Sequence, residues 1–191
     1  MKLVLATRNP HKVREFGALL APHEVGALPK EVELPPETGA TFAENALEKA
    51  RAAARALGVP AIADDSGIQS EALGGAPGVR SARFAGEHAT DEQNLDKLLA
   101  EAPAGSALAY VCALAFVAPD GTEQLVEGRC TGTLAVQPRG SGGFGYDPAF
   151  IPDDLEGGRT MAELSPDEKD AIRGSRRSLA RPRSRSPRTA G

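Results

Sequence analysis

The sequence predicts a mixed α/β fold with one antiparallel pair of strands, and three observations carry this prediction. A short apolar run at 3–6 is followed by a polar turn and then by apolar residues at helical spacing over 13–20. An alanine-rich helix is expected at 41–57, directly before a second apolar run at 61–63. Two long strand candidates, 107–117 and 124–136, flank Pro119-Asp120-Gly121, which is a strong hairpin turn.

The composition indicates one ordinary globular domain or two small lobes. The 191 residues are 41% hydrophobic and 25% charged, but only 4% are aromatic, so the core must consist of Ala, Leu, Val and Ile. The two cysteines cannot form a disulfide framework and suggest a reducing compartment. No apolar run approaches the roughly 18 residues that span a bilayer. A cytoplasmic protein without a membrane partner is therefore expected.

The charge is distributed unevenly along the chain. Seven of the 22 basic residues lie at 173–191, which contain no acidic residue, so residues 1–172 carry 15 basic and 26 acidic groups and a net charge of −11. An acidic body does not bind nucleic acid by bulk attraction, and no specific nucleic-acid partner is expected. The Arg/Ser/Pro-rich segment 173–191 has no apolar periodicity and is predicted to be disordered.

The first turn of the chain is a candidate phosphate site. The pattern Thr7-x-Asn9-x-x-Lys12 stands between a strand and a helix for which Asn9 is the expected cap and Pro10 the first residue. Free backbone N–H groups at a helix start bind phosphate readily, and Lys12 would add a positive charge. A plain capped helix with a solvated lysine is the alternative interpretation. Residues 22–40 are expected to hold one short strand and a loop.

The helix at 41–57 carries two polar side chains on one face. Thr41 and Glu44 predict a capping box at its start. Asn45 and Lys49 are four residues apart, so either side chain could reach a phosphate, although an exposed polar stripe is the default expectation. Glu37, in the preceding Pro/Gly loop, has no capping role and is the freer candidate metal ligand.

Adjacent carboxylates follow the apolar run at 61–63. We expect this strand to end at Asp64-Asp65-Ser66-Gly67, and ligands bind at the carboxyl edge of open α/β sheets. One carboxylate could hold Mg²⁺ while the other braces the loop. An Asx turn into Ser66-Gly67 explains the pair equally well. Ser66 has no G-x-S-x-G context, so a nucleophilic role is not expected.

The second half of the chain contains a helix, the hairpin and a glycine-dense loop. A short amphipathic helix capped near Thr90 is expected at 91–101, and another helix should start at Ser165. The loop at 142–147 places Phe144 and Tyr146 among glycines, so Phe144 could stack on a purine or simply belong to a surface hairpin. Cys112 and Cys130 fall in the strand candidates and are predicted to be small core residues.

Together these patterns are more specific than any one of them. In order, they are Thr7-x-Asn9-x-x-Lys12, Gly39-x-Thr41-Phe42-x-Glu44-Asn45-Ala46-x-x-Lys49-Ala50, Ala63-Asp64-Asp65-Ser66-Gly67, Leu73-Gly74-Gly75-x-Pro77-Gly78 and Gly142-Gly143-Phe144-Gly145-Tyr146-Asp147-Pro148. The chain resembles the inosine/xanthosine triphosphate pyrophosphatase family from about residue 2 to Ile172. The resemblance implies an elongated mixed β-sheet with flanking helices, two lobes around a substrate cleft, and a homodimer.

The resemblance also implies a reaction and a set of site residues. The expected reaction is the Mg²⁺-dependent hydrolysis of ITP, dITP and XTP to the monophosphate and pyrophosphate, which cleanses the nucleotide pool. Asp65 would be the catalytic base and a metal ligand, Glu37 the second metal ligand, and Lys49 and Lys169 would neutralise charge. Further substrate contacts would come from Thr7, Arg8, Asn9, Pro10, His11, Lys12, Ser66, Phe144, Gly145, Tyr146 and Asp147.

The sequence departs from the family pattern after Ile172. Arg173-Gly174-Ser175 stands where the family continues with Ser-His-Arg-Gly and a packing helix, so residues 173–191 replace that segment. The family's His-Arg pair contacts the base. The alternative function is therefore a nucleotide-binding homologue with weak or unselective turnover.

Overall fold

The computed structural model describes residues 1–165, 167–169 and 172, and these fall into two compact units. Unit 1 consists of Met1–Asp65 and Ala113–Glu127, and unit 2 of Ser66–Cys112 and the described residues from Gly128 onward. The expectations for the segment that begins at Arg173 lie outside the described residues.

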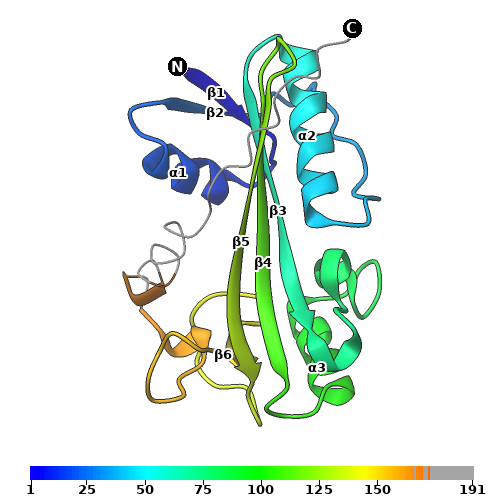
Figure 1. Ribbon diagram of the computed structural model, residues 1–191, viewed down its shortest axis with the longest axis vertical. Helices are drawn as coiled ribbons and strands as arrows, with labels where there is room; N and C mark the ends of the chain where they lie inside the picture. The colour runs from blue at the N-terminus through cyan, green and yellow to red at the C-terminus, as the bar shows by residue number, and fades with distance from the viewer. Residues whose placement is uncertain (166, 170–171, 173–191) are drawn as a thin grey trace, which may run out of the picture. The chain divides into compact units, whose positions relative to one another are not determined.

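The described strands form one mixed sheet, as the sequence predicts. Their order is β2-β1-β3-β4-β5-β6 (Figure 1). β1 pairs in parallel with β2 and with β3, whereas β6 pairs antiparallel with β5. Three of the strands, β3, β4 and β5, contribute residues to both units. The bounds are β1 (Lys2–Leu5), β2 (Glu24–Ala27), β3 (Ala61–Ser70), β4 (Ala107–Val117), β5 (Glu123–Leu134) and β6 (Phe150–Pro152).

The helices of unit 1 are α1 (Pro10–Leu19) and α2 (Phe42–Leu57). The Thr41 side chain accepts a hydrogen bond from the Glu44 N–H, and Gly58 ends α2 with a φ of 66°. The expected capping box is only half formed, because the Glu44 carboxylate accepts from the Ala40 N–H and not from that of Thr41. Packing of α2 relies on small residues, since Ala46, Ala50, Ala53 and Ala54 are all buried.

The hairpin and the helix of unit 2 agree with the predictions. β4 has the expected bounds, and β5 ends two residues earlier than the predicted strand. Gly121 has a φ of 87°, and the Asp120 carboxylate accepts from the Thr122 N–H, so the turn chemistry accounts for the reversal. In α3 (Asp91–Glu101), Thr90 and Gln93 form a complete capping box.

β3 corrects the prediction that a short strand ends at the two aspartates. The strand continues to Ser70, so Asp64 and Asp65 lie within it and make no Asx turn. Its pairing with β1 stops at Ile62, but β4 is its other neighbour and supports the strand further along. Periodicity could not reveal this extension, because the second half of β3 is stabilised by a strand more than 35 residues away in the chain.

Unit 2 has a core of larger side chains. Its buried members come from β3 to β6, α3 and the segments that follow: Ile68, Leu95, Leu98, Ala102, Leu108, Leu134, Tyr146, Ala149, Phe150, Met161, Leu164 and Ile172. Cys130 packs against this cluster, but Cys112 is exposed, so the prediction of two core cysteines is wrong for Cys112. Short 3-10 turns complete the unit: η1 (Glu71–Leu73), η2 (Gly78–Arg83), η3 (Asp147–Ala149) and η4 (Met161–Glu163).

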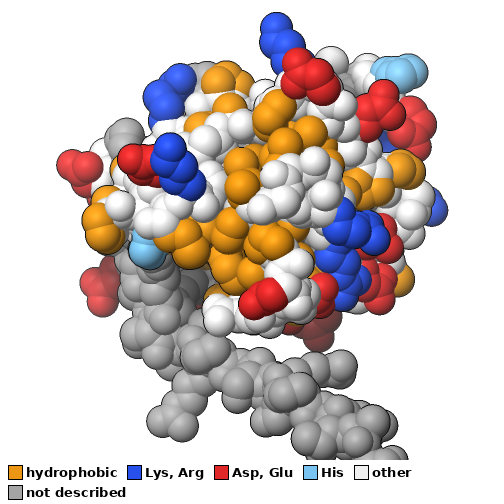
Figure 2. All heavy atoms as spheres, turned by 90° about the horizontal axis from the view of Figure 1, so that it is seen from above, with side chains coloured by type: hydrophobic (Ala, Val, Ile, Leu, Met, Phe, Trp, Pro, Cys, Tyr) orange, Lys and Arg blue, Asp and Glu red, His pale blue; other side chains and the backbone are white. Residues whose placement is uncertain are grey.

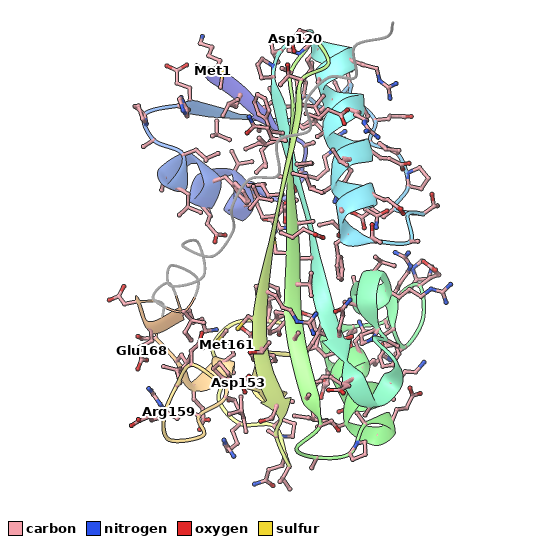
Figure 3. All side chains as sticks on the ribbon, in the orientation of Figure 1. Met1, Asp120, Asp153, Arg159, Met161 and Glu168 are labelled. Carbon is pink, nitrogen blue, oxygen red and sulfur yellow. The ribbon has the colours of Figure 1, made fainter. Side chains whose placement is uncertain are left out.

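The predicted helix start at Ser165 is present in the described residues. The Glu168 N–H donates to Ser165 Oγ, and the Ser165 N–H donates to the Glu168 carboxylate. Arg159 lies 2.7 Å from the same carboxylate (Figure 3), and its hydrogen bond lowers the pKa of Glu168 to about 2. This ion pair ties the loop after β6 to the last described helical turn.

No helix within the described residues is long and apolar enough to cross a membrane. The face seen in Figure 2 has an area of hydrophobic side chains near its middle, with acidic and basic side chains interspersed around it.

Candidate active site

The predicted site residues form two groups, one in each unit. In unit 1, the turn between β1 and α1 is built as a helix start. The Asn9 N–H donates to Thr7 Oγ1 at 3.2 Å, and α1 begins at Pro10 with no acidic residue in its first turn. A helix start without an acidic side chain favours an anion. For His11, only the backbone, within α1, is described.

Arg8 has a role in the structure that the sequence did not suggest. Its guanidinium donates to the carbonyl oxygens of Pro29, Lys30 and Val32, at 3.0, 3.3 and 2.5 Å. Arg8 therefore holds the loop after β2 against the β1–α1 turn. Lys12, near the start of α1, is instead the basic residue that contacts an aspartate of β3.

Lys12 and the first aspartate form an ion pair. Lys12 Nζ lies 2.6 Å from Asp64 Oδ2, and the Asp64 side chain is only 7% exposed. A lysine paired to a nearly buried carboxylate is held in one position, so its charge is available at the β1–α1 turn without further ordering.

Asn45, on α2, binds Asp65, the second of the two aspartates of β3. Its Nδ2 donates to Asp65 Oδ2 at 2.8 Å, and its Oδ1 accepts from the Gly39 N–H at 2.8 Å. The side chain is 1% exposed. A Cβ at Gly39 would lie 2.7 Å from Asn45 Oδ1, so the loop before α2 needs glycine at this close approach. The default expectation of an exposed polar stripe on α2 is therefore wrong.

Lys49 lies one turn further along α2 and joins the loop to the strand. Its Nζ contacts Glu37 Oε1 at 2.5 Å and the Asp64 carbonyl oxygen at 2.6 Å, and the residue is 9% exposed. The prediction that Asn45 and Lys49 share a face is confirmed, because both side chains turn toward the two aspartates of β3.

The donor set of unit 1 is suited to a hard divalent cation that completes its coordination with ligand oxygens. Asp65 and Glu37 place carboxylate oxygens against Asn45 and Lys49 of α2, whereas the Asp64 carboxylate is paired with Lys12 of α1. Among the described residues, no group of three or more His, Cys, Asp or Glu side chains is arranged to hold a metal ion alone. Mg²⁺ commonly uses one or two carboxylates and takes its other ligands from water and substrate phosphates, so this arrangement fits it.

The group in unit 2 is centred on Asp147. Its Oδ1 accepts from the Tyr110 hydroxyl at 2.9 Å, and its Oδ2 lies 2.9 Å from Lys169 Nζ. The sequence predicted Asp147 and Lys169 through the family resemblance and missed Tyr110, which looks like an ordinary strand residue in β4. Ser66, at the start of this unit, is exposed on β3 beside Asp65.

The loop before Asp147 is fixed at several points, although its tip is open. Phe144 is 74% exposed. The neighbouring Gly145 N–H donates to Asp91 Oδ2, and the Tyr146 hydroxyl donates to the Ser81 carbonyl. Burial raises the pKa of Tyr146, so this phenol keeps its proton. Gly143 has a φ of 85°, and a Cβ there would overlap the Asp147 carboxylate. An exposed aromatic ring on an anchored loop provides a stacking surface.

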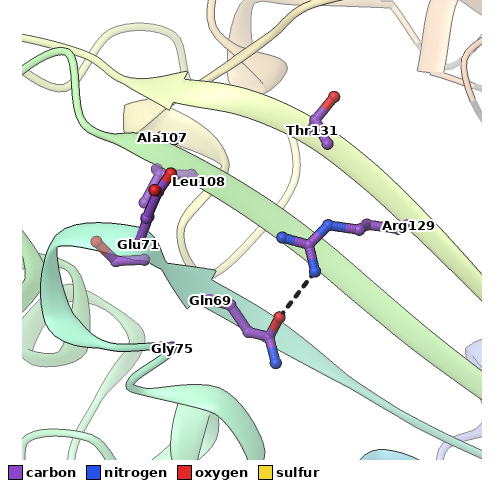
Figure 4. A pocket seen from close by; sticks show the side chains of 8 residues that line it. Gln69, Glu71, Gly75, Ala107, Leu108, Arg129 and Thr131 are labelled. Atoms are coloured by element: carbon purple, nitrogen blue, oxygen red, sulfur yellow. Dashed lines mark hydrogen bonds between the residues drawn. The ribbon is translucent and has the colours of Figure 1, made fainter.

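A separate pocket of unit 2 contains none of the predicted site residues. It is lined by Gln69, Ser70, Glu71, Gly75, Ala107, Leu108, Arg129 and Thr131. Arg129 donates to Gln69 Oε1 at 3.1 Å across its wall (Figure 4). The pocket lies outside both groups, so the candidate site does not depend on it.

Comparison with known proteins identifies the relatives of the chain. The model of the Ham1 family matches residues 3–183. The chain is 49% identical to a dITP/XTP pyrophosphatase of Streptomyces avermitilis, over 90% of each protein. It is 51% identical to the protein of the same name from Geobacillus kaustophilus, over 90% of this chain and 87% of that one.

Solved structures agree with these relatives. The crystal structure of a nucleoside-triphosphatase / dITP/XTP pyrophosphatase from Mycobacterium abscessus has a TM-score of 0.82 and 45% identity, covering 94% of this chain and 97% of that chain. The structure of a Ham1 protein from Staphylococcus aureus has a TM-score of 0.83 and 36% sequence identity, covering 94% of this chain and 95% of that chain. The family match spans nearly the whole chain and the fold is shared at this identity; the chain belongs to the Ham1 family.

Proposed function

We propose that the protein hydrolyses non-standard purine nucleoside triphosphates, namely ITP, dITP and XTP, to the monophosphate and pyrophosphate. Relatives with 49% and 51% sequence identity are named dITP/XTP pyrophosphatases, and the name of the M. abscessus structure includes the same activity. The observation that carries the proposal is the group in unit 1, where Lys12 of α1 pairs with Asp64, while Asn45 and Lys49 of α2 contact Asp65 and Glu37.

The lysines and the turn would bind the triphosphate. Phosphoryl transfer needs little covalent chemistry from the protein, because most of the catalysis is positioning and neutralisation of charge. The N–H groups at the start of α1 and the Lys12 ammonium would hold phosphate oxygens. Lys49, held by Glu37 and the Asp64 carbonyl, would place a second positive charge beside them.

Asp65 would orient and deprotonate the attacking water. Asn45 donates to Asp65 Oδ2 and so fixes the rotation of the carboxylate that would bind the water. Water adds to phosphorus, its proton passes to Asp65, and the bond between the α- and β-phosphates breaks with release of pyrophosphate. Mg²⁺ held by Asp65 and Glu37 would supply positive charge next to the phosphates.

The group in unit 2 would recognise the base. Phe144 offers an exposed ring for stacking, and Lys169 offers N–H donors that suit the 6-oxo group of hypoxanthine or xanthine. An adenine base presents an amino donor at the same place and would be disfavoured. Ser66, Gly145 and Tyr146 would complete the contacts with substrate.

Pyrophosphate release tests the proposal directly. The protein is assayed with ITP, XTP, dITP, ATP and GTP, with Mg²⁺ and with EDTA, beside Asp65→Asn and the control Asp120→Asn. Asp120 lies in the β4–β5 turn, where an asparagine can still accept from the Thr122 N–H. We expect selective turnover of the first three substrates that requires Mg²⁺, is lost in D65N and is retained in D120N.

Two other outcomes would contradict the proposal. Folded protein that binds ITP without releasing pyrophosphate would be a nucleotide-binding homologue. Folded protein that neither binds nor hydrolyses any of the five nucleotides would exclude a nucleotide site altogether.

We also propose that the protein acts as a homodimer, because the family resemblance implies this assembly. Light scattering coupled to size-exclusion chromatography should give twice the mass of 19.8 kDa. A monomer at micromolar concentration would contradict it.

A further inference from the structure

Tyr110 donates a hydrogen bond to Asp147, the carboxylate that also pairs with Lys169. The phenol lies on β4 and donates to Asp147 Oδ1 at 2.9 Å, while Lys169 Nζ takes Oδ2 at 2.9 Å. The side chains of Asp147 and Lys169 are only 13% and 14% exposed. Both oxygens of this carboxylate therefore have a partner, and the two donors together fix its rotation.

The direction of the Tyr110 hydrogen bond is determined by its surroundings. Burial raises the pKa of Tyr110 well above its ordinary value, and the charge of Asp147 raises it further. The phenol is therefore protonated near neutral pH, so it donates and the carboxylate accepts. The ring is held as well, because it packs on Phe150 with 4.7 Å between ring centroids.

Packing of the glycine loop adds a second constraint. Gly143 lies so close to the pair that a Cβ would overlap Asp147 Oδ2 and come within 2.5 Å of Lys169 Nζ. The loop backbone thus covers the ion pair immediately before Phe144. Lys169 has three N–H donors and uses one on Asp147, which leaves the others for a ligand at this loop.

We propose that Tyr110 is a positioning residue that sets the selectivity for 6-oxopurines, an inference that rests on the proposed function of the same site. With one donor on each oxygen, the Asp147 carboxylate is held in one rotation and cannot turn toward the base, and Lys169 presents only donors. A 6-oxo group accepts from these donors, whereas the 6-amino group of adenine finds no acceptor. Without the phenol, Asp147 Oδ1 is free to accept from that amino group.

The decisive variant is Tyr110→Phe, which removes the hydroxyl and keeps the ring on Phe150. We expect the ratio of kcat/KM for ITP to kcat/KM for ATP to fall about tenfold, the effect of one hydrogen bond of about 1.4 kcal/mol. The change should appear mainly as a lower KM for ATP. If Tyr110 had a merely structural role, kcat/KM would fall equally for ITP and ATP and the ratio would stay unchanged. That result would overturn the inference.

Two further variants make the test specific. Thr131→Val removes a hydroxyl from the neighbouring strand β5 at a position that lines the other pocket, and it should leave the ratio unchanged. In an Asp147→Asn background, Tyr110→Phe should have no further effect on the ratio, because its action passes through that carboxylate. A full tenfold effect of Y110F in the D147N background would contradict the inference.

Binding separates this inference from the proposed function. Calorimetric affinities for ITP and ATP are measured with wild type and Y110F, after the near-ultraviolet circular dichroism of both has been compared. Wild type that binds ITP selectively without hydrolysis would refute the proposed function, while loss of that selectivity in Y110F would still support the role of Tyr110. If Y110F does not fold, Tyr110→Leu keeps a large apolar side chain without any hydrogen-bond donor, and unchanged selectivity in that variant overturns the inference.

Discussion

Replacing Asn45 by alanine should destabilise the protein and weaken catalysis together. Asn45 is 1% exposed and makes two hydrogen bonds, one from the Gly39 N–H and one to the Asp65 carboxylate. A neutral buried hydrogen bond contributes about 1 kcal/mol, and one to a charged group about 1.5–3 kcal/mol. The expected loss in the free energy of unfolding is thus about 2.5–4 kcal/mol, or roughly 5–15 °C in Tm for a chain of this size.

Stability is measured by urea unfolding, monitored by far-ultraviolet circular dichroism. The kcat for ITP is measured without urea, at a temperature where the variant is folded. Asn94→Ala is the matched control, because Asn94 is also 1% exposed and its side chain bonds Ala82 and Ala85 in unit 2. N94A should lose similar stability and keep its kcat, whereas N45A should lose both. An N45A protein with unchanged kcat would refute the positioning of Asp65 by Asn45.

Asn45→Asp separates the two hydrogen bonds of this side chain. The aspartate can still accept from the Gly39 N–H, but it faces Asp65 Oδ2 with a like charge. A like charge raises the pKa of a carboxyl group in the folded state, so N45D should be less stable at neutral pH and should recover stability as the pH falls through about 6 to 4. A stability difference from wild type that does not depend on pH would contradict this reasoning.

Three further predictions concern other contacts. Gly143→Ala should cost about 1–3 kcal/mol and reduce ITP selectivity, because φ is 85° and the new Cβ would overlap the Asp147 carboxylate; thermal melting and the ITP/ATP ratio measure this. Lys49→Met should lower kcat about 10²–10³-fold in the pyrophosphate assay while the protein stays folded, since a buried positive charge beside the phosphates is lost. Glu123→Gln should cost only about 0.5 kcal/mol at pH 7, because solvent screens the pair with Arg51. Hydrogen bonding to Arg51 lowers the pKa of Glu123 from 4.5, so its contribution is present above pH 4.5 and is lost as the pH falls below that value, and urea melts of E123Q and wild type should converge at acidic pH.

Local signals predicted much of the fold. The β4–β5 hairpin depends on Asp120 and Gly121, and α3 on the capping residues Thr90 and Gln93, so both can be predicted from adjacent residues. The length of β3 could not, because its second half depends on β4, a strand distant in the sequence. Glu44 could be assigned to the start of α2, but its actual partner, the Ala40 N–H, depends on the local backbone of the loop before the helix.

The site shows the same division. The sequence context alone identified three candidates: the phosphate-binding turn before α1, the Asp65 carboxylate and the Lys49 ammonium. The family motifs identified Asp147 and Lys169. Arg8, Asn45 and Tyr110 could not be interpreted in this way, because each acts on residues between 6 and 37 positions away. A polar side chain of this kind is recognised as a positioning group only when its tertiary neighbours are known.

The three strands shared by the two units have a consequence for engineering and evolution. The boundary between the units passes through β3, β4 and β5, and Asp65 and Ser66 fall on opposite sides of a single peptide bond. Neither unit can be excised as a module, since a cut at the boundary would sever three strands in place of one linker. Limited proteolysis should accordingly yield no stable half-molecule, and recombination between relatives should succeed by exchange of loops or whole chains.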